Sequence, residues 1–132
     1  MRRLKNIFMV LVAGFLVFGC VRPMEPVISI KNESLLLKSS FSLATIEETI
    51  KAAAERRRWV LVKQGPQKFQ GSLNSRNRYF LTVEITFTKT TLSIRRLDSK
   101  NLRFDGSDIH WKANKWIKDL RTAIIKRTAK LR

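Results

Sequence analysis

The segment Tyr-Phe-Leu-Thr-Val-Glu-Ile-Thr-Phe, residues 79–87, has the most regular pattern in the chain. Large apolar side chains occupy every second position, at Tyr79, Leu81, Val83, Ile85 and Phe87. Threonine and glutamate fill most of the positions between them. Strict alternation is typical of an antiparallel strand with one buried face and one solvated face. The segment therefore predicts a half-buried antiparallel strand.

Three neighbouring segments also have strand patterns. Residues 59–64 alternate, and the Gly65-Pro66 pair after them favours a turn. Residues 68–73 form a weaker second strand, and residues 91–97 follow the central segment. Short turns between successive strands leave no room for a parallel crossover. Together the four segments predict an antiparallel meander of about four strands.

An amphipathic helix is predicted on each side of the meander: Ile46 and Ile50 belong to the apolar stripe of the first, and Ile124 to that of the second. Thr45 and Glu48 fit a capping box, in which each side chain satisfies a backbone amide of the first turn. The second helix is expected over residues 111–129, capped by Asp108 or His110, with its apolar stripe covering the sheet. The predicted fold class is α+β: a single small domain with an N-terminal helix, the meander, and a basic amphipathic C-terminal helix packed on the sheet.

The first twenty residues have the pattern of a secretory signal. A basic start is followed by an apolar run over residues 7–18, which is shorter than the ~20 residues of a transmembrane helix. The stretch from Leu16 to Cys20 resembles the lipobox of bacterial lipoproteins. That resemblance implies removal of residues 1–19, a lipid on Cys20 and, because Val21 is not aspartate, an outer-membrane location facing the periplasm. The alternative is an ordinary secretory signal that ends in a buried thiol.

The expected organisation has three parts: a signal peptide over residues 1–19, a lipid-anchored tether over residues 20–44, and the α+β domain over residues 45–132. Pro23 and Pro26 disfavour helix in the tether. Residues 27–30 could form a short edge strand. The apolar residues 35–37 are unsuited to a free tether, so part of this segment is expected to dock on the domain.

The chain is strongly basic, with 27 lysines and arginines, 10 acidic residues and a net charge of +17. Removing residues 1–19 takes three bases and no acid, which leaves +14. Such a high positive charge favours anionic partners: anionic lipid, lipopolysaccharide or an envelope protein. The candidate contact residues are Arg56, Arg57, Arg58, Lys112, Lys115, Lys118, Arg121, Lys126 and Arg127. The alternative is that these cations complement helix dipoles or form a solvated helix back.

Residue counts exclude several kinds of site. With one histidine, His110, the chain cannot form a multi-histidine metal site, and no histidine-based catalytic set is apparent. With one cysteine it cannot form an internal disulfide, and no glycine-rich phosphate-binding loop is present. We therefore expect no cofactor, no metal and no catalysis. A small accessory enzyme of the envelope and a single-stranded nucleic-acid binder remain as alternatives.

The C-terminal third contains the pattern Ser99-x-Asn101-Leu102-x-Phe104, then Ile109-His110, then Asn114-x-Trp116-Ile117-x-x-Leu120. This pattern resembles the C-terminal signature of a group of small bacterial envelope lipoproteins without an assigned activity. The resemblance covers roughly residues 45–125 and implies that His110, Asn114 and Trp116 act as fold residues. Two positions depart from the pattern: Arg58 stands where a glycine is expected, and Ala113 where an aromatic residue is expected.

Overall fold

The structure is a computed structural model that describes residues 23–132, so the expected signal peptide and Cys20 lie outside the described residues. In chain order the elements are β1 (Met24–Pro26), β2 (Ile30–Ser34), α2 (Leu43–Arg56), β3 (Val60–Gly65), β4 (Lys68–Ser75), β5 (Tyr79–Phe87), β6 (Thr91–Lys100), β7 (Asp108–His110) and α3 (Trp111–Ala129). The predicted α+β class is confirmed. Within residues 23–132, neither α2 nor α3 is long and apolar enough to cross a membrane.

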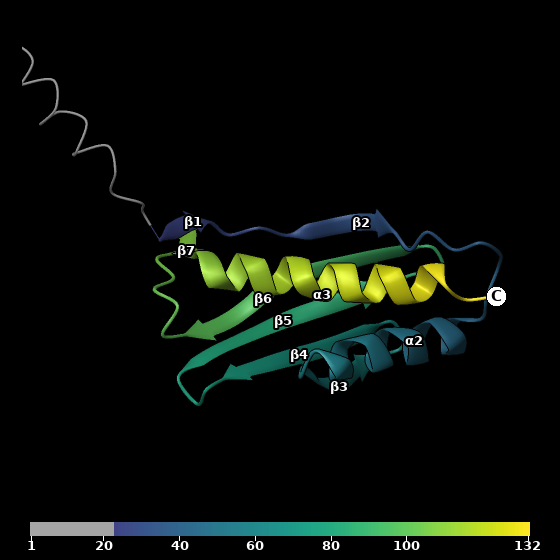
Figure 1. Cartoon of the computed structure of the whole chain (residues 1–132), viewed down its shortest axis with the longest axis horizontal. Helices are drawn as coiled ribbons and strands as arrows, with labels where there is room; N and C mark the ends of the chain where they lie inside the picture. Colours follow the sequence, from purple (N-terminus) through teal and green to yellow (C-terminus); the bar gives the residue numbers. More distant parts are fainter. Residues whose placement is uncertain (1–22) are drawn as a thin grey trace, which may run out of the picture.

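The main sheet has five antiparallel strands in the order β2-β6-β5-β4-β3 (Figure 1). Its β3–β6 part is the predicted meander. The additional strand, β2, comes from the segment before the first helix and pairs with the free edge of β6. The predicted edge strand at residues 27–30 therefore starts later than expected. A separate two-stranded pairing joins β1 to β7.

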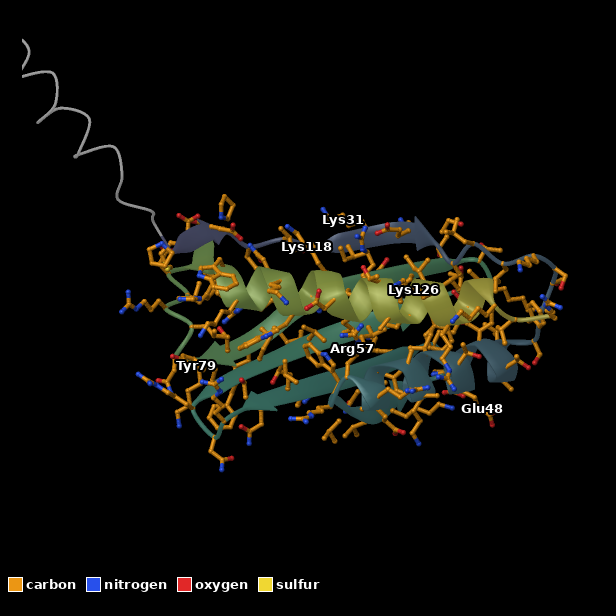
Figure 2. All side chains as sticks on the ribbon, in the orientation of Figure 1. Lys31, Glu48, Arg57, Tyr79, Lys118 and Lys126 are labelled. Atoms are coloured by element: carbon orange, nitrogen blue, oxygen red, sulfur yellow. The ribbon has the colours of Figure 1, made fainter. Side chains whose placement is uncertain are left out.

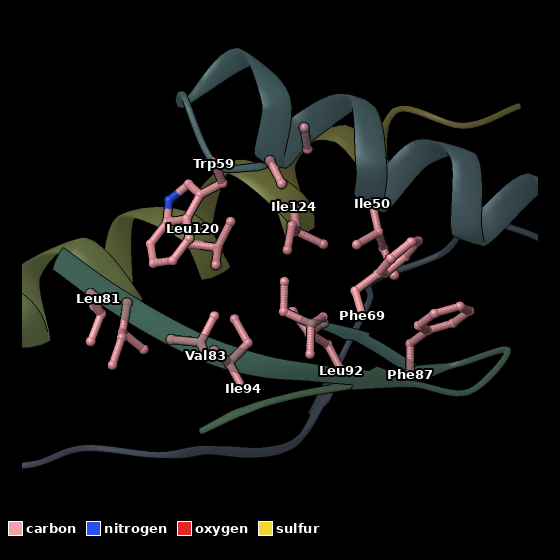
Figure 3. Close-up of a cluster of buried hydrophobic side chains, with 14 of the residues drawn as sticks. Ile50, Trp59, Phe69, Leu81, Val83, Phe87, Leu92, Ile94, Leu120 and Ile124 are labelled. Carbon is pink, nitrogen blue, oxygen red and sulfur yellow. The ribbon is translucent and has the colours of Figure 1, made fainter. Parts of the chain in front are cut away.

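Both helices lie on one face of the sheet, and the core fills the space between these layers (Figure 3). The sheet contributes the alternating side chains of β5, from Leu81 to Phe87, together with neighbours such as Leu92 and Ile94. The helices contribute their predicted stripes, including Ile50 and Ile124. On the edge strand β3, Val60 and Val62 share one face, as the alternation of residues 59–64 predicts. This face points away from the helices, and both side chains are exposed.

The N-cap of the first helix lies three residues before the predicted one, Thr45. Ser42 is the N-cap, and its hydroxyl oxygen accepts a hydrogen bond from the Thr45 N–H at 3.2 Å. Thr45 therefore lies inside the first turn. The prediction was wrong because serine caps a helix at least as well as threonine, and Leu43 adds an apolar residue to the first turn.

The same helix ends in a Schellman motif formed without glycine. Arg58 has φ +68°, in the left-handed region. The Trp59 N–H bonds to the Ala54 carbonyl oxygen at 3.1 Å, and the Arg58 N–H bonds to the Glu55 carbonyl oxygen at 3.0 Å. These are the two bonds that define the motif, and glycine normally occupies the left-handed position. Arg58 therefore adopts the conformation for which the resemblance expects a glycine.

Buried polar side chains of α3 hold the N-terminal segment on the domain. The Asn114 oxygen accepts from the Ile28 N–H at 3.0 Å, and its amide donates to the Pro26 carbonyl oxygen at 2.8 Å. The Thr128 hydroxyl donates to the Leu35 carbonyl oxygen at 2.7 Å. Asn114, Thr128 and Leu35 are almost fully buried. Of the expected tether, residues 24–34 thus lie mostly in strands and Leu35 lies in the core.

Candidate functional site

A basic groove runs between the last turn of α2 and the C-terminal part of α3. Its volume is about 750 Å³, and its walls are Ala53, Arg56, Arg57, Ala123, Lys126, Arg127, Lys130 and Leu131. Five of these eight residues are cationic, and none is acidic. Figure 2 labels Arg57 and Lys126 in the region between the two helices. Among the ion pairs of residues 23–132, none involves a cation of this groove.

Helix periodicity and small floor residues explain the shape of the groove. Ala53 and Arg56 are three residues apart on α2, so they share a face. On α3, Ala123 and Lys126 are related in the same way, and Lys130 follows four residues later. Where the helices pass each other, Ala53 and Ala123 leave room at the floor, and the long cationic side chains form the rim. Both helices end near this groove, so its cations also complement the negative ends of the two dipoles.

A smaller hollow of about 320 Å³ adjoins the groove through a shared residue, Arg57. Its lining includes Arg58, Arg76, Trp59 and Trp116, with Asp119 as the one acidic residue. The Asp119 carboxylate pairs with the Lys115 ammonium at 2.9 Å.

Both Arg58 and Arg76 have positive φ angles, of +68° and +58°. Residues held in this region by their surroundings cluster at functional sites in proteins. Two of the arginines that line the smaller hollow thus occupy backbone positions that are unfavourable for arginine.

The structure divides the nine predicted contact residues into two sets. Five of them border the two hollows: Arg56, Arg57, Arg58, Lys126 and Arg127. The other four lie elsewhere along α3 and do not join this site: Lys112, Lys115, Lys118 and Arg121.

Each of those four cations has its own environment. Lys112 lies over the Tyr79 ring at 4.9 Å, and Lys115 pairs with Asp119. Arg121 pairs with Glu33 of β2 at 2.8 Å, and Lys118 is solvent-exposed. Arg121 therefore helps to hold the N-terminal segment.

Two further cations of the site, Lys130 and Arg76, were not predicted. Lys130 lies four residues after Lys126, so helical spacing alone could have identified it. Arg76 lies in the turn between β4 and β5, and only the packing of that turn beside Trp116 brings it to the hollow. No local pattern marks it.

His110 belongs to the framework rather than to the groove. It is the N-cap of α3, and its Nδ1 accepts a hydrogen bond from the Lys112 N–H at 3.2 Å. Burial lowers the pKa of His110 below its ordinary value, and the nearby Lys112 and Arg103 charges lower it further. Within residues 23–132, no group of three or more His, Cys, Asp or Glu side chains is arranged to hold a metal ion.

Comparison with protein-family models, curated proteins and solved structures found no match. A surface of five cations without a carboxylate attracts anions, and arginine in particular forms paired hydrogen bonds to phosphate and carboxylate oxygens. The groove offers three arginines and two lysines for such contacts. Its volume exceeds that of a single small ion, so it suits a ligand with several negative groups.

Proposed function

We propose that this protein is a lipid-anchored module of the cell envelope whose groove between α2 and α3 binds an anionic envelope component without catalysis. The observation that carries the proposal is the concentration of five cations on one groove that lacks acidic residues. The anchor part of the proposal is Cys20, with residues 1–19 removed as a signal peptide and the domain held at the outer membrane facing the periplasm. Lipopolysaccharide phosphates and anionic lipid head groups have the required charge.

The adjoining hollow supports an elongated ligand. Arg57 borders both spaces, so the cations continue from Lys130, the C-cap of α3, to Arg76 beside β4. Trp116, half-buried in the smaller hollow, adds an apolar wall that a purely ionic site would not need. A molecule with separated negative groups and an apolar part fits this combination better than a single phosphate ion does.

The geometry gives less support to single-stranded nucleic acid. That alternative depends on exposed aromatic side chains along residues 76–87. Phe87 is buried against Phe69 in the core, and Tyr79 lies under the cationic groups of Arg78 and Lys112. A row of free rings for base stacking is therefore not formed by this segment.

Co-sedimentation with lipid tests the groove. The domain from Pro23 onward carries every described element, and we expect it to bind lipopolysaccharide and phosphatidylglycerol vesicles but not phosphatidylcholine vesicles. Because a cation near an anionic surface contributes about 1 kcal/mol, the triple variant R57Q/K126Q/K130Q should bind about 100-fold more weakly. High salt should abolish binding of the unmodified domain.

A charge-matched variant provides the control. Lys38, Lys51 and Lys89 are exposed and do not border either hollow. K38Q/K51Q/K89Q carries the same net charge as the groove variant and should bind nearly as tightly as the unmodified domain. Equal loss in the two triple variants would mean that net charge alone attracts the ligand, and the proposed groove site would be rejected.

A further inference from the structure

The end of the domain formed by β1, β7 and the start of α3 also has the composition of a surface that rests against lipid. We call it the anchor end. It comprises the exposed or half-buried side chains Arg78, Tyr79, Lys100, Arg103, Trp111 and Lys112. It lies at one extreme of the long axis, at the left in Figure 1, where Figure 2 labels Tyr79. The C-terminus lies at the opposite extreme.

We infer that the anchor end lies directly on the head groups of the bilayer that holds the lipid on Cys20. This inference rests on the proposed anchor. Three peptide links separate Cys20 from Pro23, so their Cα atoms lie within about 11 Å of each other in any conformation. The Pro23 carbonyl oxygen accepts a hydrogen bond from the Trp111 N–H at 2.8 Å. The start of α3 is therefore held close to the acyl chains.

The N-terminal segment is held firmly on the domain, so the short distance from Cys20 fixes the position of the whole domain. β1 pairs with β7 through Met24 and His110, and Asn114 binds the linker that follows β1. The chain is thus fastened to the domain from Pro23 onward. A long free tether would let the domain turn in any direction, whereas a connection of three peptide links keeps this end toward the membrane.

The side chains of the anchor end suit that position. Trp111 is 41% exposed, although tryptophan is a large apolar residue. Tyr79 has the Lys112 ammonium at 4.9 Å and the Arg78 guanidinium at 5.3 Å from its ring centroid. Tryptophan and tyrosine are enriched at the boundary between lipid and water, where lysine and arginine reach the head groups.

Net charge contributes little at this end. Three acidic residues share it: Glu25, Asp105 and Asp108. The Asp105 carboxylate accepts hydrogen bonds from the Ser107 and Asp108 N–H groups, at 2.9 and 2.7 Å, and so stabilises the turn that contains it. Contact at the anchor end therefore depends on the short connection and the aromatic side chains, and it should depend on salt much less than binding at the groove.

This orientation also restricts the partner of the groove. Its residues from Ala123 to the C-cap Lys130 come 12 to 19 residues after Trp111, which corresponds to about 18–28 Å along the axis of α3. The groove therefore lies well beyond the head groups that the anchor end contacts. Anionic lipid or lipopolysaccharide that stays in the anchoring membrane is then out of reach of the groove. Its ligand must be a molecule of that chemistry presented from the aqueous space or from a facing membrane.

Tryptophan quenching by brominated lipid tests the orientation. The full-length protein is purified from bacterial membranes, and mass spectrometry first establishes whether Cys20 is acylated. The acylated protein is then placed in phosphatidylethanolamine–phosphatidylglycerol vesicles with brominated acyl chains. We expect quenching of the unmodified protein, loss of most of that quenching in W111F, and retention in W116F. Quenching should persist at high salt.

A second preparation separates this inference from the proposed anchor. Cys20 is the only cysteine, so a maleimide phospholipid can be attached there to a chain that begins at residue 20. If natural Cys20 is not acylated, the proposed anchor fails, while the coupled protein still reports whether a lipid at Cys20 brings Trp111 to the bilayer. Equal quenching of the unmodified protein and W111F would overturn the inference, and so would the absence of quenching in both coupled proteins.

Discussion

Replacing Arg58 by glycine should stabilise the end of the first helix relative to a matched glycine substitution at Arg57. Arg58 has φ +68° and completes a Schellman motif, whereas Arg57 has φ −97°. A left-handed conformation costs a residue with a side chain roughly 1–2 kcal/mol that glycine does not incur. Of these two arginines, only Arg58 carries this penalty.

The other effects of the two substitutions nearly cancel in the comparison. Glycine increases the conformational entropy of the unfolded chain, which lowers the free energy of unfolding by about 0.4–1 kcal/mol at either position. Each substitution also removes an exposed cation from the negative end of the helix dipole, which lowers the free energy of unfolding by about 0.3 kcal/mol. R58G should therefore be about 0.5 kcal/mol more stable than the unmodified domain, and R57G about 1 kcal/mol less stable.

Thermal and urea unfolding followed by circular dichroism measure this difference. A gap of 1–2 kcal/mol between the variants corresponds to roughly 4–9 °C in Tm for a domain of this size. R58G should also weaken binding of a ligand that occupies the smaller hollow, so stability and binding should change in opposite directions. If R58G is no more stable than R57G, the left-handed arginine carries no strain and the reasoning is refuted.

Three other changes test the framework. Asn114→Ala should reduce the free energy of unfolding by about 2–4 kcal/mol and increase hydrogen exchange at Ile28, whose N–H loses its acceptor; an unchanged exchange rate would contradict this. Thr128→Val should cost about 1–2 kcal/mol because the buried Leu35 carbonyl oxygen loses its donor, while Thr128→Ser should cost less. Because the folded pKa of His110 lies below its ordinary value of 6.5, stability should fall as pH decreases below about 6.5, and His110→Asn, which keeps a capping acceptor, should remove that part of the pH dependence.

The elements that were predicted well are those whose signal is local. The alternation of residues 79–87 identifies β5 and its buried face, because successive side chains of a strand point to opposite sides. Helical spacing likewise identified the stripe containing Ile46 and Ile50, and the extent of α3. The α+β class follows from the order of these segments along the chain. Cap choice was less well determined, because Ser42 and Thr45 are both competent caps and packing selects between them.

The sequence by itself therefore determined the features that periodic patterns indicate: which segments are strands and helices, and which face of each is apolar. The tertiary structure alone decided which distant residues meet. Pairing of β2 with β6, burial of Asn114 and Thr128 against the N-terminal segment, and convergence of Arg57 with Lys126 all join residues about sixty or more positions apart. Such contacts arise from the packing of complete elements against one another, and no short-range pattern in the chain encodes them.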